Sequence, residues 1–178
     1  MKNQNTKKLA YAALFLALCL VLPMLTGQIP QIGSMLLPMH IPVLLCGLVC
    51  GWQYGAAVGF VAPLLRSVLF GMPPMYPVAI AMAFELLTYG LVIGLVYRRM
   101  AQKGAAGVYA ALLTAMVAGR LVWGVAEVVL LGLGGKAFTA QTFLAGALLN
   151  AVPGIIVQLV LIPAVMAVLQ KAGAVKEY

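Results

Sequence analysis

The chain has 178 residues, of which 65% are hydrophobic and 8% are charged, whereas soluble domains are roughly 45–50% apolar and about 25% charged. This composition excludes a soluble globular protein and indicates an integral membrane protein. The formal net charge of +8 comes from eleven basic residues against three glutamates, and in a membrane chain such an excess marks orientation rather than a nucleic-acid partner.

Hydropathy, interrupted by glycine, proline and charged clusters, predicts an all-α integral membrane protein with a single transmembrane domain, residues 1–178. We expect a compact bundle of six transmembrane helices. The predicted spans are about 9–25, 40–51, 54–70, 76–97, 106–131 and 141–170. The second span is short for a straight crossing of the bilayer, so we expect it to be tilted or kinked.

The basic residues predict the orientation of the chain. With the N-terminus inside, one side collects eight of them and the other keeps Lys136 alone. The eight are Lys2, Lys7, Lys8, Arg98, Arg99, Lys103, Lys171 and Lys176. This asymmetry predicts that both termini lie inside, and it places the loops 26–39, 71–75 and 132–140 outside, where they could cover a ligand.

Small residues recur at helical spacing in two places. Gly47, Gly51, Gly55 and Gly59 follow one another at every fourth position, a spacing that lets neighbouring helix backbones approach closely. In the first span Ala10, Ala13 and Ala17 form one smooth face. That face could pack within the chain or could dock onto another membrane subunit.

Four ionisable residues fall at membrane depth, where a charge is costly and normally finds a partner or water. From a rise of about 1.5 Å per residue, Arg66 and Glu127 lie roughly 6 Å below the outer helix ends, and Glu85 and Arg120 lie roughly 14–17 Å below them. The four therefore match by depth in two pairs of opposite sign, both in the outer half of the membrane.

Helical spacing gathers further polar groups with these charges. Arg120, Trp123 and Glu127 share one face of the fifth span, and Asn150, Gly154 and Gln158 share a face of the sixth. These faces predict a polar cavity that opens outward, with His40 and Tyr76 near its rim. The charges could simply be buried pairs that hold the bundle together, but their concentration favours a binding site. The expected site residues are His40, Arg66, Tyr76, Glu85, Arg120, Trp123, Glu127 and Asn150.

Catalytic and metal chemistry have little support in the sequence. The chain has no aspartate, which excludes aspartyl proteases of the membrane, and His40 is its only histidine, which excludes a metal site of several imidazoles. It has no GxxxxGK[ST] motif to cradle ATP. The cysteines Cys19, Cys46 and Cys50 lie in apolar runs and are read as small packing residues. We therefore expect no enzyme, no cofactor and no metal.

Together these features resemble the substrate-binding S components of energy-coupling factor (ECF) transporters, the vitamin-capturing membrane subunits of bacteria and archaea. The similarity covers nearly the whole chain. It rests on the lysine-bearing N-terminus, on Ala13-x3-Ala17, on the glycine-spaced segment IPVLLCGLVCGWQYGAAVGFVAPLLRSVLFG and on a basic inner loop after the fourth span.

The resemblance implies a division of labour. An S component binds a vitamin or precursor from outside, docks through its first-span alanine face, here Ala13 and Ala17, onto a transmembrane coupling subunit that carries two ATPases, and topples in the membrane to release the ligand inside. It implies a multi-pass protein of the bacterial or archaeal cell membrane, with the lipid bilayer as its surroundings.

The ligand stays open at this point. If both arginines are committed to glutamates, a neutral or zwitterionic ligand fits. If one arginine is free, a carboxylate such as pantothenate, niacin or a folate fits, and Trp123 could stack on a ring such as flavin. Pantothenate is slightly favoured. The competing hypotheses are a self-sufficient proton-coupled secondary transporter or small channel, with Glu85 or Glu127 as its proton site, and an intramembrane enzyme that uses these glutamates.

Overall fold

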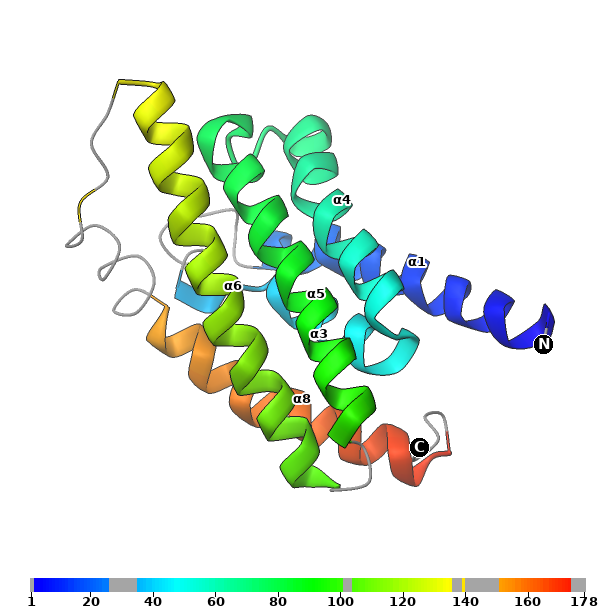
Figure 1. The fold of residues 1–178 in the computed structure, drawn as a ribbon. Coiled ribbons are helices and arrows are strands. Elements are labelled where there is room, and N and C mark those ends of the chain that lie inside the picture. The colour runs from blue at the N-terminus through cyan, green and yellow to red at the C-terminus, as the bar shows by residue number, and fades with distance from the viewer. Residues whose placement is uncertain (1, 26–34, 101–103, 136–138, 140–150, 174–178) are drawn as a thin grey trace.

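The computed structural model describes residues 2–25, 35–100, 104–135, 139 and 151–173. Every regular element in these residues is helical, and five of the helices are long and apolar enough to cross a membrane, which confirms the predicted all-α membrane bundle (Figure 1). The elements are α1 (Lys2–Leu25), α3 (His40–Cys50), α4 (Trp52–Phe70), η1 (Met75–Ala79), α5 (Ile80–Met100), α6 (Ala105–Leu133) and α8 (Val152–Lys171).

The helices lie where the spans are predicted, with differences at their ends. Helix α1 extends back to Lys2 rather than beginning at residue 9, and α8 begins at Val152, while residues 141–150 of the predicted sixth span lie outside the described residues. Helix α3 has 11 residues and is therefore about 16 Å long, against a hydrocarbon core of about 30 Å. Which helices cross the bilayer, and in which direction, stays a prediction.

Helices α3 and α4 form a tight hairpin that turns at Gly51. Gly51 has a φ of 101°, a backbone conformation that glycine adopts without steric cost. Beyond the turn the two helices pack backbone against backbone, because a Cβ atom on Gly55 would lie 2.7 Å from the Cα of Gly47 and 2.8 Å from the carbonyl oxygen of Gly90. The four-residue glycine spacing thus brings α3, α4 and α5 together. Packing within the chain is sufficient to explain this spacing.

Prolines delay the start of α5. Pro77 forces the residue before it towards an extended backbone, and Tyr76 accordingly has φ −116° and ψ 133°. A wide turn, η1, therefore precedes α5, and the regular helix begins at Ile80 rather than at the predicted residue 76.

Helix α5 lies between α4 and α6 and packs on both (Figure 1). Helix α3 is almost entirely buried and packs on α1, α4, α5 and α8. A short helix that does not reach both membrane surfaces is tolerated where neighbouring helices cover its ends. This arrangement brings the start of α3, the second turn of α5 and the middle of α6 to one place inside the bundle.

Candidate functional site

Glu85 is the centre of a buried polar cluster. Its side chain on α5 is 2% exposed, and its Oε1 lies 3.0 Å from Nη1 of Arg120 on α6. Equal depth left open whether Arg120 pairs with Glu85 or binds a ligand, and in the structure the two side chains form an ion pair. The distance is that of an ion pair, but Glu85 Oε1 makes no hydrogen bond of good alignment. The pair neutralises two buried charges and leaves hydrogen-bonding capacity unused.

His40 joins the cluster from α3. Its Nε2 lies 3.4 Å from the same Oε1 of Glu85, and its ring meets the ring of Tyr89 edge to face at 5.2 Å between centroids. The predicted place of His40 at the rim of a cavity is wrong, since its side chain is only 1% exposed. His40 is the first residue of α3, and it lies inside the bundle beside Glu85.

Arg120 also lies beside Trp123, one turn further along α6. The centre of its guanidinium is 6.0 Å from the centroid of the indole ring, a distance at which the ring quadrupole attracts a cation. The Arg120 side chain is 13% exposed, so its charge is partly shielded from solvent. Trp123 and Glu85 thus hold the guanidinium from two sides.

Arg66 does not pair with Glu127. Instead its Nη1 donates a hydrogen bond to the backbone carbonyl of Leu20 on α1, and its guanidinium lies 5.2 Å from the centroid of the Phe70 ring. Equal depth does not make these two residues neighbours, because α5 separates α4, which carries Arg66, from α6, which carries Glu127. Arg66 ties the end of α1 to α4 and lies apart from the Glu85 cluster.

Of the remaining predicted residues, Glu127 and Tyr76 make no ion pair with the cluster. Glu127 is buried on α6, and no ion pair within the described ranges includes it. Tyr76 is exposed and donates a hydrogen bond to the backbone carbonyl of Leu130, which ties η1 to the last turns of α6. Asn150 lies outside the described residues.

Two buried residues are missing from the predicted site. Tyr89 follows Glu85 by four residues, so the i, i+4 spacing on one helix face could have indicated it. Gln158 is 1% exposed on α8, and its Nε2 has no hydrogen-bond partner. Its position on a polar face of the sixth span could have indicated that Gln158 is buried inside the bundle.

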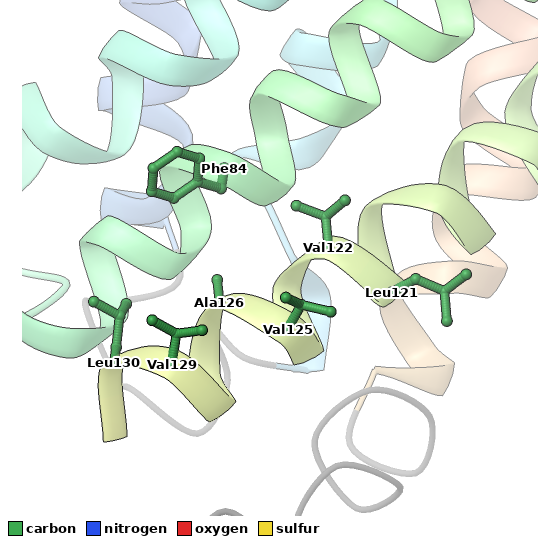
Figure 2. A pocket seen from close by; sticks show the side chains of 7 residues that line it. All are labelled: Phe84, Leu121, Val122, Val125, Ala126, Val129 and Leu130. Carbon is green, nitrogen blue, oxygen red and sulfur yellow. The ribbon is translucent and has the colours of Figure 1, made fainter. Parts of the chain in front are cut away.

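A groove of about 410 Å³ lies elsewhere, on the outer face of α6 beside α5 (Figure 2). All of its lining side chains are apolar: Phe84, Leu121, Val122, Val125, Ala126, Val129 and Leu130. This is the face of α6 opposite to Arg120 and Glu127, at about 100° per residue. With no polar side chain to orient a ligand, the groove suits lipid chains rather than a polar nutrient.

The comparisons with known proteins agree with this membrane architecture. Residues 7–166 match the family described as the substrate-specific component of ECF transporters. Neither the curated proteins nor the solved structures gave a match. Because the family match spans most of the described helices, the chain belongs to the substrate-specific components of ECF transporters.

Proposed function

We propose that this chain captures a vitamin or related micronutrient from outside the cell and delivers it through an ATP-driven ECF coupling module. The match of residues 7–166 to the substrate-specific components carries this proposal. In this family the membrane subunit binds substrate, and partner ATPases hydrolyse ATP. The chain itself is then a non-catalytic subunit that works with one transmembrane coupling subunit and two ATPases.

The Glu85 cluster is the proposed substrate site. His40, Glu85 and Arg120 come from three different helices, and each has a buried nitrogen or oxygen without a hydrogen-bond partner within the described ranges. Buried polar groups are normally hydrogen-bonded, so a cluster with several unmet groups suits a ligand that satisfies them. Trp123, beside Arg120, offers a surface on which a ring or chain of the ligand could pack.

Pantothenate is the favoured ligand, because a compact acid with hydroxyl and amide groups suits an arginine and a tyrosine together. Niacin and folate-type acids remain candidates, as does riboflavin, whose flavin could stack on Trp123. Arg66 leaves the proposed site, since a carbonyl and a phenyl ring already engage its guanidinium. Tyr76, Glu127 and Asn150 stay candidates for contacts at the outer end.

Ala13 and Ala17 are the proposed docking residues for the coupling subunit. Both are exposed on α1, while Ala12, Phe15 and Cys19 on the other side of the helix are buried in the bundle. Leu14 and Val21, more than half exposed, extend this face with apolar side chains. Small residues on an apolar face let a partner helix approach closely, which supports assembly through this side of α1.

The proposed setting is the cell membrane of a bacterium or archaeon, with both termini inside. Basic residues end two of the helices, Arg98 and Arg99 in the last turn of α5 and Lys171 in that of α8. Together with Lys7 and Lys8 they support this orientation through the positive-inside preference.

Co-purification tests the proposal. The tagged chain is expressed with an ECF coupling subunit and its two ATPases, and the complex is weighed by native mass spectrometry. We expect a complex with one copy of this chain, and ligand uptake by cells only when the module is present and its ATPases are active. Uptake by the chain alone, driven by a proton gradient, would instead establish the secondary transporter.

A further inference from the structure

Arg120 offers one free edge of its guanidinium. Its Nη1 faces Glu85 Oε1 at 3.0 Å. Its Nε and Nη2 are buried and have no hydrogen-bond partner among the residues that the structure describes. The N–H groups of Nε and Nη2 point in the same direction because the guanidinium is planar, so they form a fork that matches the two oxygens of a carboxylate.

Two other buried side chains also have nitrogens without a hydrogen-bond partner among the described residues. The amide Nε2 of Gln158 can only donate, and both ring nitrogens of His40 lack a hydrogen-bond partner. Gln158 lies on α8, which packs against α3 and α6, the helices that carry His40 and Arg120. Acceptor oxygens of a ligand would complement the donors of Arg120 and Gln158, and a hydroxyl or N–H group of the same ligand would complement Glu85 Oε1.

We infer that the ligand carries a carboxylate, whose two oxygens accept hydrogen bonds from Nε and Nη2 of Arg120. The inference rests on the proposed substrate-binding role of the chain and narrows its substrate class to organic acids. Glu85 holds the guanidinium by its opposite side, and Trp123 lies against it, so the fork is oriented before the ligand arrives. Such preorganisation lowers the ordering cost of binding.

The cluster holds two basic side chains and one acidic one. Nη1 of Arg120 lies 3.0 Å, and Nε2 of His40 3.4 Å, from the same Oε1 of Glu85. A ligand carboxylate at the fork of Arg120 therefore adds a second acidic group to a cluster that already has two basic side chains.

Matched pairs of acids and neutral analogues test the inference. The purified chain in detergent is titrated with pantothenate against panthenol, nicotinate against nicotinamide, and biotin against biotin amide, with thermal stabilisation and affinity as readouts. We expect at least one acid to bind, and its neutral partner to bind roughly tenfold or more weakly, because a bidentate charge-assisted contact is lost. This comparison on the wild-type chain needs no variant.

Two substitutions assign the preference to Arg120. Arg120→Lys keeps a positive charge beside Glu85 but removes the fork, so the preference for the acid should fall to within a few-fold. Arg66→Lys is the matched control, since Arg66 contacts Leu20 and Phe70 instead, and it should keep the full preference.

Equal binding of acid and neutral partner, binding of neutral members alone, binding of no acid in the set, or a full preference in Arg120→Lys would overturn the inference. Failure of the inference is distinguishable from failure of the proposed function. A chain that assembles with the coupling module but imports a neutral nutrient refutes the carboxylate alone. A chain that does not assemble refutes the function.

Discussion

Gly90→Ala should destabilise the bundle, because at Gly90 the backbone of α5 lies directly against the backbone of α4. A Cβ atom at this position would lie 2.2 Å from the carbonyl carbon and oxygen of Gly55 and 2.7 Å from the backbone nitrogen of Ala56. Ordinary contacts of this kind begin near 3.4 Å. The obstacle is backbone, so no side chain can rotate away, and the two helices would have to separate by about 1 Å in a closely packed interior.

The expected cost is about 1–3 kcal/mol or more, the usual range for overpacking a filled interior. The replacement also brings up to about 1 kcal/mol of helix propensity in the opposite direction, so a net loss of stability means that the clash outweighs it. Gly132→Ala is the matched control. It lies in the last turn of α6, is exposed, and has no atom within 4 Å of a Cβ, so only the favourable propensity applies.

Thermal unfolding of both variants in the same detergent, followed by tryptophan fluorescence, measures the difference. We expect the apparent melting temperature of Gly90→Ala to fall and that of Gly132→Ala to stay level or rise slightly. If Gly90→Ala has the same melting temperature as the wild type, α4 and α5 are not in backbone contact at this point. The position of Glu85 inside the bundle, which depends on this packing, would then be wrong.

Three further predictions concern charges and surfaces. Glu85→Gln leaves the charge of Arg120 buried without its carboxylate and should cost about 3–5 kcal/mol of stability. Glu127→Gln, at a glutamate without an ion pair among the described residues, should cost less, and equal melting temperatures of the two variants would contradict this. Arg66→Ala should lower stability by about 1.5–3 kcal/mol, because its hydrogen bond to a backbone carbonyl is lost. Its affinity for ligand, measured by calorimetry, should stay within a few-fold of the wild type, and a large loss of affinity in a folded variant would show that Arg66 belongs to the binding site. Ala17→Leu, at an exposed position of α1, should weaken assembly with the coupling subunit in pull-downs and leave ligand binding unchanged, so intact assembly would refute docking through this face.

Composition and spacing predicted much of the fold. Few charges and long apolar runs permit only helices in a membrane chain, and the four-residue glycine spacing anticipated the contact of Gly47 with Gly55. The start of α5 was predicted less well, because Pro77 restricts the backbone of Tyr76 and a hydropathy pattern does not register that restriction. The burial of α3 follows from the packing of α1, α4, α5 and α8 around it, and a hydropathy pattern does not carry that information.

The site shows when the equal depth of two charged residues predicts that they pair and when it does not. Glu85 and Arg120 share a depth and lie on neighbouring helices, so their pairing was predictable up to adjacency. Arg66 and Glu127 share a depth too, but α5 lies between their helices. Depth gives one coordinate only, and the order of helices around the bundle depends on side-chain packing throughout the chain. The same order brings His40 to Glu85.

Transport in proteoliposomes tests the central claim most directly. The chain is reconstituted alone and together with the ECF coupling subunit and both ATPases, and the entry of its radiolabelled ligand is followed with and without ATP. The account predicts that the chain alone binds the ligand but moves none of it, and that entry requires both the module and ATP hydrolysis. Sustained entry through the chain alone, with or without a proton gradient, would contradict the account.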